Sequence, residues 1–162
     1  MKLVIANTEE QCQLISDLAY IIYPKHYSQY VEMNNIIHFL DHYQTADCIF
    51  SEIENGIRYF LIEFNNESVG YIAIEQKDEC LHLYKLYLLE SSRGKGLGKF
   101  AMNWIISEAK RLLLRSIELI VNQKNKGSIV FYQSYGFEIT DSYEKKYVEN
   151  FVNLDHNMEL SL

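Results

Sequence analysis

Several features that mark large protein classes are scarce in this sequence. No apolar run approaches the length of a membrane span, and the run near the N-terminus is too short for a signal peptide. The three cysteines, Cys12, Cys48 and Cys80, are scattered and form no C-x-x-C pair. An odd, scattered set predicts reduced thiols rather than a disulfide framework. We therefore expect a cytoplasmic protein that has no membrane partner.

Positive charge is also in deficit. The chain has 15 lysines and arginines against 22 aspartates and glutamates, a formal net charge of −7. This balance argues against nucleic acid as the main partner and suits a cationic small molecule. Hydrophobic residues make up 48% of the 162 residues, and 13 are tyrosines. The composition predicts one globular domain, residues 1–162, and leaves open whether it is a monomer or a homodimer.

The first third of the chain predicts one strand and two helices. Lys2–Ala6 is a short apolar run of strand length, and Asn7 or Thr8 can cap a helix that starts after it. That helix is expected to end near Tyr23, because the residue before Pro24, the only proline, is biased away from the α region. A polar and aromatic loop, residues 25–30, and a second helix, residues 31–42, should follow.

His38 and His42 stand four residues apart on the second predicted helix, a spacing that can hold a metal. A catalytic zinc site needs three protein ligands and a structural site needs four. No third partner is evident in the sequence, so we predict a solvated helix face and no metal.

Residues 57–64 and 68–75 are β-rich runs separated by Asn65-Asn66-Glu67, which indicates a hairpin. Gly70, inside the second run, predicts a bulge or a close approach of another backbone. A turn at residues 77–79 leads into the apolar and aromatic run of residues 81–89. Three antiparallel strands are therefore expected before the stretch that follows.

That stretch has glycines at alternate positions, Gly94, Gly96 and Gly98, interleaved with the basic residues Arg93, Lys95 and Lys99. From Leu97 onward the apolar spacing becomes helical. A strand thus runs into a glycine-rich turn that opens a helix. Glycine lets backbone N–H groups face a ligand, and the first turn of a helix has unpaired N–H groups with partial positive charge. The stretch predicts a phosphate cradle.

The spacing excludes two common phosphate motifs. Lys99 is followed by Phe100, whereas a Walker A loop needs serine or threonine there. The glycines follow G-x-G-x-G, and the dinucleotide pattern is G-x-G-x-x-G. The segment Arg93 to Gly98 instead matches R-x-x-G-x-G and resembles the pyrophosphate-binding motif of the GNAT superfamily, the acyl-CoA-dependent N-acyltransferases.

A second stretch carries the same resemblance. Asn125, Ser128, Tyr132, Gly136 and Phe137 match the GNAT signature N-x-x-A-x-x-x-Y-x-x-x-G-F, with serine in place of the usual alanine. From the residues alone, Asn125 is a predicted helix cap and Gly136 the residue past the helix end. The aromatic spacing of the first 60 residues more weakly resembles bacterial polyamine N-acetyltransferases.

Residues 116–121 form another predicted strand after the loop helix. Strand, helix and strand make a βαβ unit, whose two strands should be parallel. Residues 137–140 and 153–160 are expected to close the sheet as an antiparallel pair, with a polar connection at 141–151. The resemblance implies a mixed α/β GNAT-like domain. It should have a mostly antiparallel sheet of six to seven strands and about four helices, splayed between the two central parallel strands.

The resemblance also implies where acetyl-CoA binds. Its pantetheine arm should pair with the backbone of Leu86 and Leu88, and one N–H there would polarise the thioester carbonyl. The pyrophosphate should lie on the glycine-rich turn, and Asn125 should contact the pantetheine or seat its own helix. The implied cofactor-binding residues are Leu86, Leu88, Arg93, Gly94, Lys95, Gly96, Leu97, Gly98, Lys99 and Asn125.

Acetyl transfer to an amine requires a base for the ammonium and an acid for the leaving thiolate. Tyr132 matches the family position of the acid, although it could instead only pack on the cofactor. His82 is a candidate base, because an acidic residue serves at the matching position in some members and a neutral imidazole has a suitable pKa. A strand histidine that faces solvent or is satisfied by a neighbour remains the alternative, and Glu75 or a water chain could serve instead. Cys80 could carry the acetyl group, but nothing places a base beside it.

Substrate choice is expected in the 23–30 loop, the helix after it and the 141–151 connection. Aromatic rings and carboxylates there favour a cationic amine, although solvated loops would have the same composition. The candidate substrate-binding residues are Tyr23, Tyr27, Tyr30, Glu32 and Tyr147. We expect an N-acetyltransferase that acts directly on a small primary amine such as a polyamine. A protein N-terminal or lysine acetyltransferase and a non-catalytic acyl-CoA-binding module remain the alternatives.

Overall fold

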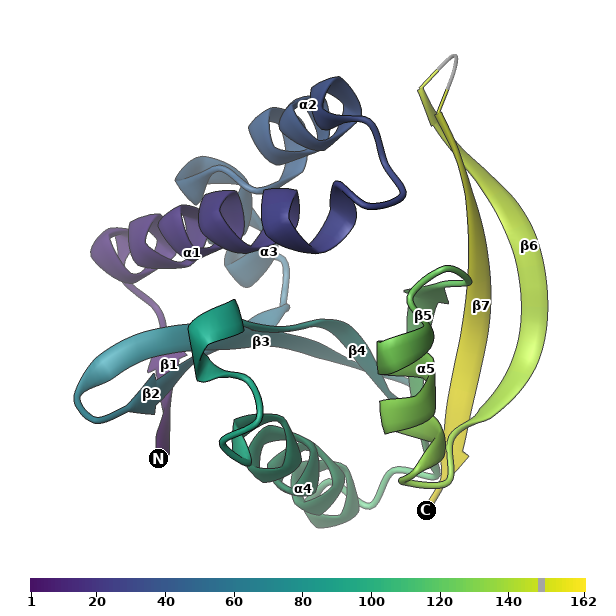
Figure 1. The fold of residues 1–162 in the computed structure, drawn as a ribbon. Helices are drawn as coiled ribbons and strands as arrows, with labels where there is room; N and C mark the ends of the chain where they lie inside the picture. Colours follow the sequence, from purple (N-terminus) through teal and green to yellow (C-terminus); the bar gives the residue numbers. More distant parts are fainter. Residues whose placement is uncertain (149–150) are drawn as a thin grey trace. The chain divides into compact units, whose positions relative to one another are not determined.

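The computed structural model describes the backbone of residues 1–148 and 151–162, and the side chains of residues 1–145 and 152–162. In these residues it is a mixed α/β protein with a seven-stranded sheet in the order β1-β2-β3-β4-β5-β7-β6 (Figure 1). The strands are β1 Lys2–Ala6, β2 Arg58–Phe64, β3 Glu67–Lys77, β4 Cys80–Leu88, β5 Ser116–Asn122, β6 Glu138–Val148 and β7 Phe151–Ser161. The α-helices are α1 Glu9–Tyr27, α2 Met33–Tyr43, α3 Ala46–Glu54, α4 Leu97–Arg111 and α5 Lys126–Gln133. The predicted class and strand number are confirmed, with five helices among the described residues rather than about four.

By its internal contacts the chain divides into two compact units. The first comprises Met1–Glu75 and Lys85–Trp104, and the second comprises Gln76–Tyr84 and Ile105–Leu162. Strand β4 and helix α4 therefore each contribute residues to both units. None of the helices in the described part of the chain is long and apolar enough to cross a membrane.

In the first unit, β1 and β3 flank β2 as antiparallel neighbours. Adjacent residues of β2 point to opposite faces of the sheet. Tyr59 contacts Glu52 of α3 on one face, and Phe60 packs against Trp104 of α4 on the other, with ring centroids 4.6 Å apart. Both faces of this part of the sheet are thus covered by helices, which explains why residues 59–62 are all buried.

The turn between β2 and β3 is the tight hairpin that the asparagine pair predicts. Asn65 and Asn66 both have positive φ angles, 53° and 65°, and Phe64 pairs with Glu67. Two residues with positive φ are typical of a type I′ turn, which suits the twist of a hairpin.

Gly70 allows the close approach that its place inside a strand predicts. The register of β2 and β3 shifts beside it, between Ile62 and Glu63. A Cβ at Gly70 would lie 2.2 Å from the carbonyl oxygen of Tyr87. No other residue fits there, so Gly70 brings the end of β4 against β3.

Helix α1 begins as expected, but the prediction that it ends near Tyr23 is wrong. Thr8 and Gln11 form a reciprocal capping box at the start. The helix passes through Pro24 and ends at Tyr27, with the N–H of Ser28 donating to the Pro24 carbonyl. Pro24 costs one backbone hydrogen bond, and the aromatic packing of Tyr23 and Tyr27 offsets that cost. Residues 25–27, expected in a loop, are the last residues of the helix.

Helix α3 lies in a segment to which no element is assigned from the sequence. Thr45 caps it by accepting a hydrogen bond from the N–H of Cys48. The helix has nine residues, and only Ile49 among them is fully buried. A short helix with one buried residue gives little periodic signal.

In the second unit, β4 and β5 are parallel, as the βαβ pattern predicts. Four residue pairs join them, from Cys80 with Ser116 to Leu83 with Leu119. Strand β7 pairs antiparallel with both β5 and β6. Asn125 caps α5 by accepting a hydrogen bond from the N–H of Ser128, and Gly136 beyond the helix has a φ of +94°.

The expected polar connection at 141–151 is largely a strand. Strand β6 extends to Val148 and pairs with β7 along its length in Figure 1. Residues 138–142 of β6 are all exposed, so the strand is held by its hydrogen bonds to β7 and shows no alternation of apolar and polar residues. Residues 149 and 150 lie outside the described part of the chain.

Candidate functional site

The glycine-rich turn joins β4 to α4 in the first unit. A single 3₁₀ turn, Glu90–Ser92, follows β4, and α4 begins at Leu97. Gly94 and Gly96 have φ angles of +74° and +80°, which L side chains rarely adopt. A Cβ at either position would meet no atom within 4 Å, so the space beside both glycines is open. This open backbone leads directly into the first turn of a 15-residue helix.

Cations surround this helix N-terminus. Arg93, Lys95 and Lys99 are all exposed, and the Lys95 ammonium lies 5.8 Å from the centre of the Phe64 ring. The first turn of a helix, the positive end of its dipole and three nearby cations are the features that favour binding of an anion. The geometry therefore supports the cradle that the sequence predicts.

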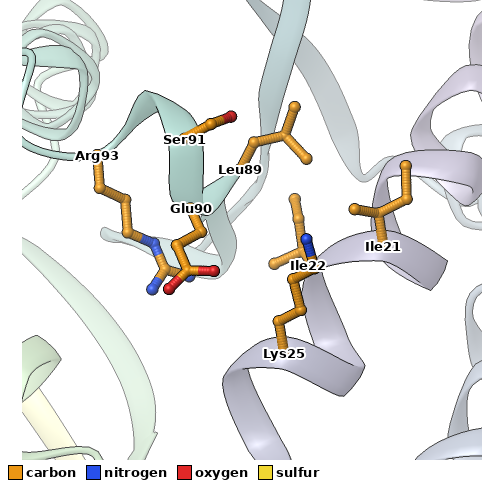
Figure 2. A pocket seen from close by; sticks show the side chains of 7 residues that line it. All are labelled: Ile21, Ile22, Lys25, Leu89, Glu90, Ser91 and Arg93. Carbon is orange, nitrogen blue, oxygen red and sulfur yellow. The ribbon is translucent and has the colours of Figure 1, made fainter.

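A hollow of about 280 Å³ lies beside the turn, within the same unit (Figure 2). Helix α1 forms one side of it and the segment after β4 forms the other. Aliphatic side chains and three charged groups share its wall. The lining residues are Ile21, Ile22, Lys25, Leu89, Glu90, Ser91 and Arg93.

An aromatic cluster joins the end of α1 to the end of β4. The Tyr87 ring lies 4.8 Å from Tyr23 and 5.6 Å from Tyr71, measured between centroids. The hydroxyls of Tyr27 and Tyr87 are 2.7 Å apart. Burial raises the pKa of Tyr87 well above its ordinary value, so this hydroxyl stays protonated. Tyr87 lies between Leu86 and Leu88, and no sequence pattern predicts its part in the cluster.

The rim of the cluster carries His26 and Tyr30. The His26 ring stands edge-on to Tyr27 at 4.7 Å and to Tyr30 at 6.3 Å. Burial and then the nearby charge of Arg93 lower the pKa of His26. Burial raises the pKa of Tyr30 to about 12, and its enclosed hydroxyl has no hydrogen-bond partner among the described residues.

A charged network, also unpredicted, lies next to the cluster. The Lys85 ammonium of β4 is 2.8 Å from a carboxylate oxygen of Glu52 on α3, and Tyr59 hydrogen-bonds both. The Lys85 side chain is only 10% exposed. Burial lowers the pKa of Lys85, and the Glu52 charge opposes that shift. A lysine within an apolar strand gives no sequence signal, because its partner lies 33 residues away.

The predicted substrate residues do not all share one environment. Tyr23, 6% exposed, is part of the packed aromatic core, whereas Tyr27 and Tyr30 are half-buried. Glu32 precedes α2, is exposed and makes no side-chain cap bond. The side chain of Tyr147 lies outside the described residues.

Tyr132 and Asn125 lie in the second unit, on and before α5. The Tyr132 ring packs between Phe131 and Phe137, with centroids 5.5 Å and 5.7 Å away. Burial raises the pKa of Tyr132 to about 12, so its hydroxyl carries a proton throughout the neutral range. Asn125 is engaged as the cap of α5.

His82 lies in the paired part of β4, opposite Glu118 of β5. Its Nδ1 is 3.8 Å from a Glu118 carboxylate oxygen, too far for a hydrogen bond but close enough for an ion pair when the ring is protonated. Its ring also packs on Tyr84 at 4.7 Å. These contacts connect His82 to β5 and to Tyr84, and its role as a base stays a prediction.

The histidine pair of α2 is an intrahelical contact. The rings of His38 and His42 stack at 4.0 Å, and His42 Nδ1 lies 2.7 Å from the His38 carbonyl oxygen. Across the described ranges, 1–148 and 151–162, no cluster of three histidine, cysteine or acidic side chains could hold a metal ion.

Comparison with known proteins decides the family. Residues 19–137 match the model of the acetyltransferase (GNAT) family. The chain belongs to the GNAT family. The match covers both signatures, from helix α1 through the glycine-rich turn to Phe137.

Individual GNAT relatives are distant. An uncharacterized N-acetyltransferase of Methanocaldococcus jannaschii is 31% identical over 103 residues, 59% of this chain; the match spans only 43% of that relative. The PaiA N-acetyltransferase of Thermoplasma acidophilum, solved in complex with coenzyme A, superposes with a TM-score of 0.83 over all of both chains at 17% identity. A ribosomal-protein-alanine N-acetyltransferase of Brucella melitensis gives 0.66 over all of both chains at 18% identity. At these identities the two solved structures establish the fold.

Proposed function

We propose that this GNAT protein is an N-acetyltransferase that moves the acetyl group of acetyl-CoA to a small, cationic primary amine, such as a polyamine, by direct attack. The main support for this proposal is the open turn at Gly94 and Gly96, which leads into the N-terminus of α4 and has three exposed cations around it. The coenzyme A of the Thermoplasma structure supports the same ligand here. Because the family match runs through residues of both units, we propose that residues 1–162 act as one acetyltransferase domain.

Each part of the turn has its own task in this proposal. The amides of Gly94, Gly96, Leu97 and Gly98 bind the pyrophosphate, because their N–H groups lie at the start of a helix. Arg93, Lys95 and Lys99 neutralise its charge. The backbone of Leu86 and Leu88 pairs with the pantetheine arm, and Asn125 seats its own helix, α5, through its cap.

Acetyl-CoA supplies an acetyl group on a thioester, whose leaving group is a thiolate. A backbone N–H at the end of β4 polarises the thioester carbonyl, as in an oxyanion hole. Tyr132 donates its phenolic proton to the departing sulfur. Burial raises the pKa of Tyr132 to about 12, so the phenol holds a proton that it can give at neutral pH.

The acceptor amine is expected at the rim of the aromatic cluster. Tyr27 and Tyr30 present half-buried rings, which attract an ammonium group by cation–π interaction. The enclosed hydroxyl of Tyr30 has hydrogen-bonding capacity that the described residues do not use. Exposed Glu32 and the net charge of −7 favour cationic over anionic amines.

Cofactor binding is tested by calorimetry and by thermal unfolding with acetyl-CoA. The wild type should bind and its melting temperature should rise with ligand concentration. Gly96→Asp should abolish both effects. Gly56→Asp is the matched control, because Gly56 also has a positive φ, +101°, and no atom within 4 Å of a Cβ built there. Gly56 lies after α3, so this variant should bind acetyl-CoA like the wild type. If the well-folded wild type binds no acetyl-CoA, the proposed function fails.

The acceptor is tested by following thiol release from acetyl-CoA across a panel of amines. Cationic amines should show a higher kcat/KM than zwitterionic or acidic amines of similar size. Selective turnover of peptide N-termini or peptide lysines would instead identify a protein acetyltransferase. Tight acetyl-CoA binding without turnover of any amine would identify a binding module.

A further inference from the structure

The proposed reaction leaves one proton without an acceptor. A primary alkyl amine is almost entirely an ammonium at neutral pH, since a model lysine has a pKa of about 10.4. The ammonium must lose a proton before its nitrogen can attack. An efficient base must therefore stand within hydrogen-bond reach of the acceptor, beside the end of β4.

We propose that His26 is this general base, an inference that rests on the proposed acetyltransferase function. His26 lies in the last turn of α1. Its ring centroid is 6.4 Å from that of Tyr87, the residue between Leu86 and Leu88. A base at this place faces the strand segment that the proposal assigns to the thioester.

The neighbours of His26 also make it the suitable titrating group of the cluster. Tyr27, the last residue of α1, and Tyr30, just beyond the helix, stand edge-on to its ring, and Tyr87 of β4 also contacts it. The raised pKa values of Tyr30 and Tyr87 keep these phenols neutral, so they cannot serve as bases at neutral pH.

The glycine-rich turn supplies the charge that faces His26. Burial and then the charge of Arg93 lower the pKa of His26, which keeps the imidazole neutral and able to accept a proton at pH 7. The same Arg93 belongs to the proposed pyrophosphate site. The base and the cofactor loop therefore lie together in the first unit.

Two other candidate bases have different surroundings. The Glu52 carboxylate is bound by the Lys85 ammonium and by the Tyr59 hydroxyl. His82 faces Glu118 across the parallel pair of strands. His26 combines a neutral imidazole with a place on the rim of the aromatic cluster.

The proton balance closes with His26 as base. The bond that forms joins the amine nitrogen to the acetyl carbon, and the bond that breaks joins that carbon to sulfur. The acceptor ammonium loses two protons. His26 takes the first and releases it to solvent, and the second replaces the proton that Tyr132 gives to the sulfur. One proton is released for each amide formed.

The test compares His26→Gln with His38→Gln, a control at an exposed histidine of α2. In His26→Gln, kcat/KM for the amine should fall by about 10²- to 10⁴-fold at pH 7, the usual worth of a positioned base. Calorimetry should show unchanged acetyl-CoA binding. His38→Gln should match the wild type in both assays.

The pH profile separates a base from a packing residue. Wild-type kcat/KM should fall on the acid side as His26 becomes protonated below its ordinary pKa of about 6.5. In His26→Gln that acid limb should vanish, and the deficit should shrink at alkaline pH, where more amine is free. Added imidazole should restore part of the activity of His26→Ala.

Two results would overturn the assignment. One is wild-type kcat/KM in a folded His26→Gln enzyme that turns over its amine. The other is an activity loss that is uniform across pH and insensitive to imidazole, which would make His26 a packing residue. Neither would touch the proposed function, which fails if the wild type binds no acetyl-CoA or acetylates no amine.

Discussion

The hydroxyl of Tyr27 lies 2.7 Å from the hydroxyl of Tyr87. This hydrogen bond joins the end of helix α1 to strand β4 across 60 residues of sequence. Tyr87 stands between the two residues whose backbone is proposed to hold the pantetheine arm. The contact thus connects the proposed acceptor rim to the proposed cofactor strand.

Deleting either hydroxyl should destabilise the protein. We expect Tyr27→Phe and Tyr87→Phe each to lower the free energy of unfolding by about 1–2 kcal/mol, because the remaining hydroxyl loses a buried partner. The double variant should cost less than the sum of the two. Urea unfolding of the four proteins measures this coupling, with Tyr43→Phe at an exposed tyrosine as control. Strict additivity would show that the bond contributes nothing.

Breaking the Lys85–Glu52 ion pair should lower the free energy of unfolding far more than breaking a surface ion pair. Lys85→Met leaves Glu52 without its cation, and we expect a loss of about 3 kcal/mol, near the low end for buried pairs because the Glu52 side chain is 33% exposed. The double variant Lys85→Met, Glu52→Gln should recover part of the lost stability, because no unpaired carboxylate is left. For comparison, Lys2→Met breaks the Lys2–Glu63 pair, whose lysine is 64% exposed, and should cost under about 1 kcal/mol. Equal losses at the two sites, measured by urea unfolding, would contradict this expectation.

Tyr132→Phe should impair turnover without impairing cofactor binding. The change removes only the hydroxyl and keeps the ring between Phe131 and Phe137. We expect kcat to fall by about 10²-fold, the low end for a positioned acid, with acetyl-CoA affinity nearly unchanged. The loss should shrink with an acyl donor whose thiol is more acidic, because that thiolate needs less protonation. Tyr135→Phe, in the turn after α5, is the matched control and should keep the wild-type kcat. If Tyr132→Phe also has the wild-type kcat under conditions where chemistry limits the rate, Tyr132 is a packing residue and not the acid.

His26 should make stability depend on pH below neutrality. Because its folded pKa is lowered, the unfolded chain takes up a proton near pH 6.5 that the folded protein does not. The free energy of unfolding should therefore fall as the pH drops below 6.5, until the folded imidazole is itself protonated. The difference between wild type and His26→Gln, followed by denaturant unfolding from pH 7.5 to 5, isolates this contribution. A constant difference over that range would rule it out.

The parts of the structure that were predictable depend on neighbours in sequence. The Asn65-Asn66 hairpin, the cap at Asn125 and the glycines before α4 each follow from the backbone angles or hydrogen bonds that those residues favour. The βαβ connection predicts the parallel pairing of β4 and β5. The glycine-rich turn needed no tertiary contact to be recognised.

The two errors arise where tertiary contacts outweigh local preference. Pro24 disfavours a helix around it, but the contacts of Tyr23 and Tyr27 with Tyr87 stabilise α1, which therefore continues past Pro24 to Tyr27. The polar residues of β6 lack apolar alternation, yet their backbones pair with β7. In both places the stabilising partner is remote in sequence, so a local pattern could not indicate it.

The resemblance to the family, the predicted phosphate cradle and the candidate acid could be inferred from the sequence alone, because each depends on residue types at short, fixed spacings. The pairing of Lys85 with Glu52 and the place of His26 near Tyr87 and Arg93 arise only in the folded chain. Those groups come from segments 33 to 67 residues apart. Burial and the charges of remote neighbours set their protonation, and both exist only once the chain has folded.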